Sequence, residues 1–207
     1  LTLYKSASYN IFKGRRVNRS DSKMKRTLKT IKNALSDKEF LEIIEELINN
    51  KKVREMQKYR QHYDVTTYEH CLNVSYVSYK IAKFFKWDYK SASRAAMLHD
   101  LFLYDWRNSK KELNIEGYHA FVHPKIALKN ASEEFNLNDR EKDIILKHMW
   151  PVTVSLPKYK ESYLITFIDK YSAIQESLNY YETYLQSKKV YRYAYIFLCL
   201  IFLGKII

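Results

Sequence analysis

The sequence predicts an all-α fold, a compact helical bundle with short loops. A chain of 207 residues with 46% hydrophobic content can bury one substantial core, which suits a single domain with tails. Only three glycines and three prolines are present, whereas a β-rich fold needs many tight turns. Apolar residues also recur at helical spacing behind capping signals. We therefore expect long helices joined by short connections.

Two helices begin at capping boxes in the first half of the chain. Residues 36–39 have the Ser-x-x-Glu form and precede FLEIIEELI, which predicts a helix from about 37 to 50. Residues 66–69 form a second box, Thr-x-x-Glu, and predict a helix that reaches Phe85. His70 should therefore lie in about the first turn of this helix.

Three further helix signals follow along the chain. Asp88 can cap a helix that leads into an adjacent His-Asp pair. Residues 138–141, Asn-x-x-Glu, open a helix that carries His148 and ends at Pro151. A long stretch with helical periodicity, from 163 to about 184, completes the predicted bundle.

Two local rules place candidate ligands relative to helix ends. His99 and Asp100 are adjacent, and neighbours on an ideal helix point about 100° apart, so both can serve one centre only where a helix ends. His123 precedes Pro124, which disfavours helical backbone at His123 and predicts a helix with Pro124 in its first turn. His119 and His123 should therefore not form a helical zinc pair.

The net charge of +13 is concentrated near the N-terminus. Residues 1–30 hold nine Lys or Arg against the single acid Asp21, so they supply +8 of the total. A groove that follows nucleic-acid phosphates needs a basic stripe on the folded body. We therefore do not expect nucleic acid as the main ligand.

The chain divides into a tail, a domain and an apolar end. Residues 1–23 are basic and aperiodic, which predicts a disordered tail, with an organelle-targeting segment as the alternative. Residues 24–185 form the predicted helical domain. Residues 186–207 include an apolar run too short to span a bilayer unaided. We expect this run to be a packing helix or tail, and a contact with a membrane surface or a partner is the alternative.

The two cysteines, Cys71 and Cys199, are far apart and have no CxxC spacing. They therefore indicate neither a disulfide framework nor a thiolate zinc site, and a reducing cytoplasm fits best. The sequence shows neither a secretory signal nor an uncharged apolar run of about 18 residues. We expect no transmembrane segment.

Four histidines and two aspartates recur at intervals of about one helix and loop. These residues are His70, His99, Asp100, His123, His148 and Asp169. Such spacing is typical of a site assembled inside a helical bundle. Imidazole and carboxylate groups suit divalent Fe, Mn, Zn or Co, with one or two ions bound. Six ligands exceed the needs of one tetrahedral ion, whereas two ions sharing a carboxylate would use them all. Asp100 is the natural bridge and the predicted catalytic residue.

In this order on predicted helices, the six residues resemble the binuclear metal site of the HD-domain superfamily, over roughly residues 55–180. The resemblance implies one ion bound by His70, His99, Asp100 and Asp169, and a second bound by Asp100, His123 and His148. It also implies an HD-type helical domain that hydrolyses a phosphomonoester or phosphodiester, frequently of a nucleotide, with metal-activated water.

The sequence departs from the family pattern directly after the His-Asp pair. Many members continue with Gly-Lys, whereas residues 101–103 are Leu-Phe-Leu, which removes a cation that could neutralise phosphate. Candidate replacements are the cations Arg107, Lys147 and Lys170, together with His62 as a substrate contact or proton shuttle.

The sequence thus predicts a cytoplasmic enzyme that hydrolyses a small phosphorylated metabolite, with a nucleotide as one candidate. Two alternatives stay open. Mixed-valent di-iron HD proteins with similar sites perform oxidative cleavage, and a regulatory module could keep the metal site without turnover. The sequence also leaves open a homo-oligomer, the substrate and the physiological metal.

Overall fold

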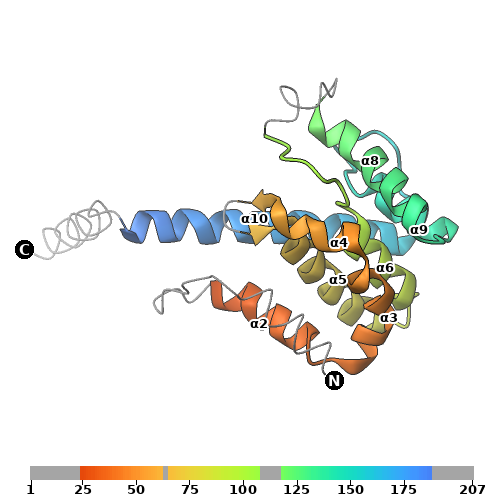
Figure 1. Cartoon of the computed structure of the whole chain (residues 1–207), viewed down its shortest axis with the longest axis horizontal. Coiled ribbons are helices and arrows are strands. Elements are labelled where there is room, and N and C mark those ends of the chain that lie inside the picture. The colour runs from red at the N-terminus through yellow and green to blue at the C-terminus, as the bar shows by residue number, and fades with distance from the viewer. Residues whose placement is uncertain (1–23, 63–64, 108–117, 188–207) are drawn as a thin grey trace, which may run out of the picture.

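The computed structural model describes residues 24–62, 65–107 and 118–187, and these residues are mostly helical, which confirms the all-α prediction (Figure 1). The predicted tail and nearly all of the apolar end lie outside the described residues. In chain order the elements are α2 (Met24–Ala34), α3 (Lys38–Asn49), α4 (Lys51–Glu55), the 3-10 helix η1 (Met56–Lys58), β1 (Arg60–His62), β2 (Val65–Thr66), α5 (Thr67–Phe84), α6 (Tyr89–Leu98), α8 (His119–Glu134), α9 (Asp139–Lys147) and α10 (Lys160–Ser187).

Side-chain caps fix the starts of several helices. The predicted box at α5 is formed. The Thr66 side chain accepts a hydrogen bond from the Glu69 N–H, and the Glu69 carboxylate accepts one from the Thr66 N–H. Asn138 caps α9 in the same way. At α3 the predicted box at residues 36–39 is replaced by Asp37, whose carboxylate accepts from the Phe40 N–H at 3.2 Å.

The helices pack around one core, and the two strands add only a short antiparallel ribbon. α5 packs against α6, and α10 packs against both α5 and α9. Figure 1 shows α10 crossing the molecule, with its C-terminal part extending past the other described helices. The largest fully buried side chains include Phe40, Leu72, Tyr79 and Leu101. Burial of each such side chain stabilises the fold by about 1.5–3 kcal/mol. No helix within the described ranges is both long and apolar enough to cross a membrane.

The prediction for His123 and Pro124 was wrong. α8 begins at His119, so His123 lies inside the helix and Pro124 falls in its second turn. A proline there removes the N–H that would bond the Ala120 carbonyl. Packing of α8 against α9 is the tertiary interaction that outweighs this local preference.

Candidate metal centre

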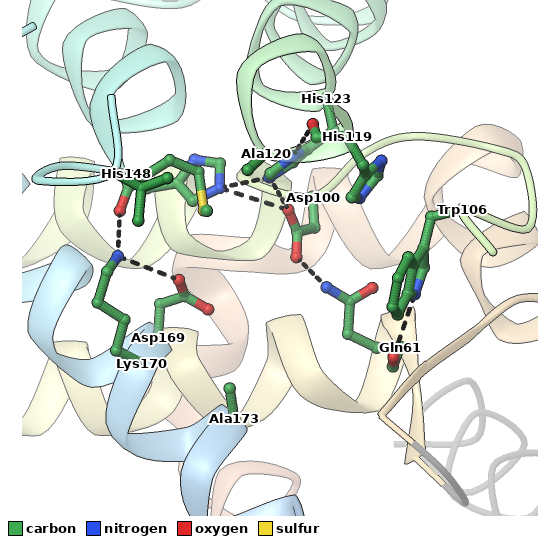
Figure 2. Close-up of a pocket in the computed structure, with 12 residues that line it drawn as sticks. Gln61, Asp100, Trp106, His119, Ala120, His123, His148, Asp169, Lys170 and Ala173 are labelled. Carbon is green, nitrogen blue, oxygen red and sulfur yellow. Dashed lines mark hydrogen bonds and ion pairs between the residues drawn. The ribbon is translucent and has the colours of Figure 1, made fainter. Parts of the chain in front are cut away.

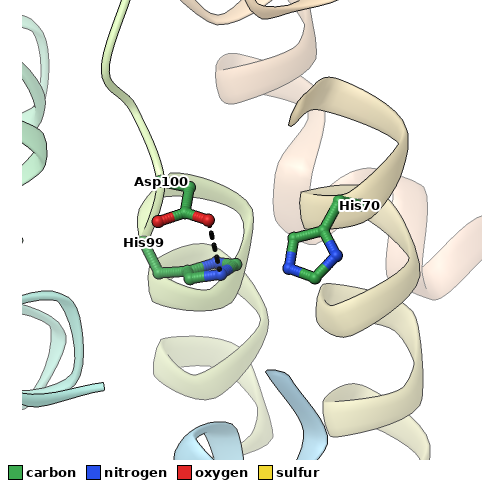
Figure 3. A group of neighbouring side chains, drawn as sticks. All are labelled: His70, His99 and Asp100. Carbon is green, nitrogen blue, oxygen red and sulfur yellow. Dashed lines mark ion pairs between the residues drawn. The ribbon is translucent and has the colours of Figure 1, made fainter. Parts of the chain in front are cut away.

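The six predicted ligands converge from five helices onto one buried cluster (Figures 2 and 3). His70 lies in the first turn of α5, as the capping box predicts. His99 is the C-cap of α6 and Asp100 follows it, so the pair sits at a helix end. His123 comes from α8, and His148 caps the C-terminus of α9. Asp169 lies within α10.

Four of these residues form what we call the α5–α10 half of the centre: His70, His99, Asp100 and Asp169. Asp169 Oδ1 lies 3.0 Å from His70 Nε2 and 3.6 Å from His99 Nε2. Asp100 Oδ2 lies 3.4 Å from His99 Nε2. Donor atoms of His70, His99 and Asp100 all lie within 4.8 Å of one another, so this group could hold a metal ion.

The α8–α9 half of the centre consists of Asp100, His123 and His148. The two imidazole Nε2 atoms are 2.8 Å apart. Asp100 Oδ1 lies 3.2 Å from His123 Nε2 and 3.5 Å from His148 Nε2. This group could also hold a metal ion. Asp100 therefore presents Oδ2 to one half and Oδ1 to the other, which is the arrangement of a bridging carboxylate.

Each of the four histidines has its Nδ1 atom next to a hydrogen-bond acceptor. The acceptors are Glu176 for His70 (3.0 Å), Ala96 O for His99 (2.7 Å), His119 O for His123 (2.8 Å) and Ile145 O for His148 (2.8 Å). A carbonyl or carboxylate that accepts from Nδ1–H directs the Nε2 lone pair toward the centre. All four Nε2 atoms are therefore oriented as metal ligands.

Burial and mutual charge shift the pKa values within the centre. Burial alone would lower the pKa of His70, but the Glu176 and Asp169 carboxylates raise it well above its ordinary value. Asp100 has the same effect on the buried His99. In contrast, burial and then repulsion from His123 lower the pKa of His148 to about 3. The α5–α10 half thus holds protons at neutral pH, whereas His148 is neutral.

Five buried side-chain polar atoms in the described part of the chain lack a hydrogen-bond partner, and two of the five belong to this centre. These two are His99 Nε2 and Asp100 Oδ1. Buried polar atoms are nearly always hydrogen-bonded, so such exceptions indicate an ion or other ligand. Imidazole nitrogens and carboxylate oxygens form a donor set suited to Zn, Fe, Mn or Co. The residues therefore fit one or two divalent ions.

A pocket of about 300 Å³ opens onto the centre (Figure 2). Its described lining consists of Gln61, Asp100, Trp106, His119, Ala120, His123, His148, Met149, Val152, Asp169, Lys170 and Ala173. Lys170 donates to the His148 carbonyl at 2.8 Å, and its Nζ lies 3.9 Å from Asp169 Oδ2. Burial lowers the pKa of Lys170. A partly buried cation thus stands beside the Asp169 carboxylate and the backbone of His148.

The other predicted substrate contacts lie elsewhere. Arg107 stacks on Trp106 and donates to the carbonyls of Arg60 and Gln61, so it braces β1. Lys147 forms an ion pair with Asp143 at 2.8 Å. Neither belongs to the pocket lining in the described part of the chain. β1 ends at His62, whose side chain lies outside what the structure describes.

Sequence reasoning missed two supporting residues. Gln61 donates from Nε2 to Asp100 Oδ2 at 2.6 Å, and its Oε1 accepts from Thr67 at 3.3 Å. Glu176 lies two helical turns beyond Asp169 on the same face of α10, and this spacing is a signal that could have identified it. The strand carrying Gln61 has no comparable signal, because three residues show no periodicity.

His119 and His123, which the sequence did not lead us to expect as a helical zinc pair, both lie on α8. The two rings stack with centroids 4.4 Å apart, and burial lowers the pKa of His119 to about 4. The Tyr104 hydroxyl lies 3.3 Å from His119 Nδ1. His119 therefore stands in the pocket wall behind a ligand and belongs to neither of the two donor groups found among the described residues.

Two donor groups that share Asp100 could each hold a metal ion. Membership of the HD-domain superfamily nevertheless stays a prediction, because it rests on these residues and their order alone. Comparison of the chain with protein-family models, with curated proteins and with solved structures found no match.

Proposed function

We propose that this chain is a metal-dependent hydrolase of the HD type that acts on a phosphomonoester or phosphodiester of a small metabolite. The observation that carries the proposal is the position of Asp100. Its two oxygens face two separate donor sets, and both sets adjoin one pocket. A centre of this kind can stabilise both the attacking and the leaving oxygen of a phosphoryl transfer.

The side chains around the pocket have distinct roles in this proposal. Divalent ions, when bound, supply water activation and neutralisation of phosphoryl charge. Asp100 holds the two sites in register, and Gln61 fixes the orientation of its carboxylate. Lys170 offers an ammonium group to a phosphoryl oxygen and replaces the cation that the family places after the His-Asp pair.

The pocket supports a small substrate. Its volume of about 300 Å³ lies at the lower end of the range for small-molecule sites, which is about 300–1,000 Å³. Trp106, Met149 and Val152 supply an apolar wall that would exclude water around the leaving group. A nucleoside monophosphate therefore belongs with small phosphate esters among the first compounds to test.

The deciding experiment combines metal analysis with a substrate panel. We expect one to two equivalents of Fe, Mn, Zn or Co in the purified chain, and hydrolysis of phosphate esters after reconstitution with one of these ions. Substrate-dependent oxygen uptake with bound iron would instead identify an oxidative enzyme. Bound metal without turnover under any of the four ions would identify a binding module, and absence of metal binding would refute the centre itself.

A further inference from the structure

The face of α10 that points away from the core carries a stripe of large apolar side chains in solvent. Their exposed fractions are 72% for Phe167, 60% for Tyr171, 58% for Ile174, 50% for Leu178 and 53% for Tyr181. The intervals between them alternate between four and three residues, which is an average period of 3.5. We call these five residues the α10 stripe. A period of 3.5 is typical of a coiled-coil seam.

The opposite face of α10 packs against the core and carries Asp169 of the metal centre. Ile165, Asp169, Ser172 and Glu176 are buried there. On an ideal helix the α10 stripe occupies only about 80° of the circumference and lies across the axis from this buried face. The stripe is therefore not part of the core or of the pocket, and its apolar character needs another explanation.

We propose that the α10 stripe binds the same stripe of a second copy of this chain, forming a two-fold symmetric dimer through a short helical pair. Both copies carry the same heptad spacing, so the side chains of one stripe can pack against those of the other. A two-fold axis uses the same patch on both partners. The C-terminal part of α10 extends past the other described helices (Figure 1).

The exposed area of the α10 stripe is large enough to bind a second copy of the chain. Five large side chains of about 150–250 Å² each, exposed by half or more, place on the order of 500 Å² of mainly apolar surface in solvent. Soluble monomers rarely leave larger contiguous apolar patches exposed. Pairing two such stripes buries about 1,000 Å² in total, which is the lower limit for a specific interface.

Two other binding partners for the α10 stripe, a membrane surface and the apolar run near the C-terminus, fit the observations less well. A helix that lies on a membrane has a broad apolar face flanked by several basic residues, whereas the α10 stripe is narrow and Lys170 is the single basic residue within 167–181. The apolar run near the C-terminus would have to turn back along α10. The intervening sequence, KKVYR, contains no Gly, Pro, Asn or Asp that would favour such a reversal.

Sedimentation velocity of the full chain over a range of concentrations tests the proposal. We expect a dimer at micromolar concentration and expect Ile174→Lys, at the centre of the stripe, to raise the dimer dissociation constant about tenfold or more. Leu178→Glu should act in the same direction. The conservative Ile174→Leu should keep the dimer, and the matched control Val154→Lys should also keep it, because Val154 is 91% exposed but lies off the stripe.

Three results would overturn the proposal. The first is a wild-type chain that stays monomeric at about 100 μM, and the second is a dimer that survives both Ile174→Lys and Leu178→Glu. The third is flotation of the wild-type chain, but not of Ile174→Lys, with phosphatidylserine vesicles while the free chain is monomeric, which would assign the stripe to a membrane surface. Far-UV circular dichroism and metal content of each variant verify that fold and centre are intact.

Discussion

The two halves of the metal centre share Asp100 but differ in charge and in what supports their histidines. In the α5–α10 half a second ligand carboxylate, Asp169, is present, and Glu176 supports His70 from behind. In the α8–α9 half both imidazoles rest on backbone carbonyls, and Asp100 is the sole carboxylate of the group. One half therefore combines two ligand carboxylates with a third carboxylate behind His70, whereas the other combines two imidazoles with the shared Asp100 alone.

The halves also differ in their position relative to the pocket. Among the imidazoles, His123 and His148 belong to its described lining and the buried His70 and His99 do not, although Asp169 of the α5–α10 half does. Together these differences indicate a division of labour. We expect the α5–α10 half to retain its ion tightly, and the α8–α9 half to exchange its ion more readily and to face the substrate.

Loss of the shared carboxylate should have the largest effect, because it removes a ligand from both halves at once. We expect Asp100→Asn to lose both ions and to lower kcat/KM on the order of 1,000-fold, with helical circular dichroism unchanged. Elemental analysis and initial rates measure the two effects. The matched control Asp105→Asn removes a half-exposed carboxylate close by in sequence and should change neither. Retained activity and metal in Asp100→Asn would refute its bridging role.

The pH dependence of metal affinity should separate the halves next. The raised pKa values of His70 and His99 mean that an ion must displace protons from them near pH 7. Affinity in the α5–α10 half should therefore rise above pH 6.5, by up to about tenfold per pH unit for each proton displaced. His148, with a pKa of about 3, gives the other half no such proton to release. Calorimetry in buffers of different ionisation enthalpy counts the protons, and equal release from both halves would contradict the division.

The metal-free chain should respond to pH in the opposite direction. A histidine whose pKa is raised by folding contributes stability that is fully present below its unfolded pKa, near 6.5, and is lost as pH rises through the folded value. The apo chain should thus lose stability above pH 6.5 while the metal-loaded chain gains it. Urea unfolding of both forms at pH 6 and pH 8 gives the comparison.

The sequence predicted which histidines and aspartates recur helix by helix better than it predicted their surroundings, and the reasons are physical. Capping boxes and the adjacency of His99 and Asp100 are local rules, so the starts of α5 and α9 and the helix end at the dyad were predictable. The helix through Pro124 was not, because tertiary packing overrides the local preference of a proline. Contacts between distant residues, such as Gln61 with Asp100, depend on the assembled fold.

Loss of Glu176, which contacts His70 Nδ1, should lower metal affinity less than loss of a ligand. Glu176→Gln keeps the size of the side chain but removes the charge that faces His70 Nδ1. We expect metal affinity of the α5–α10 half to fall by about 10–100-fold while the other half keeps its ion. Metal titration with two resolved sites measures this, with Glu46→Gln, a surface partner of Arg94, as control. An equal loss from both halves would show that Glu176 maintains the fold and does not tune one site.

We expect the smallest effect on activity from substitution of Lys170, which lines the pocket. Lys170 touches ligands of both halves, through the His148 carbonyl and beside Asp169, but it carries no lone pair for a metal while protonated. Lys170→Met should therefore leave metal content unchanged and raise KM for a phosphate ester about tenfold, with a smaller change in kcat. Lys147→Met provides the control, because Lys147 pairs with Asp143 away from the pocket. If Lys170→Met instead released an ion, the lysine would serve to position Asp169 and His148, and the pocket would need another group to hold the phosphate.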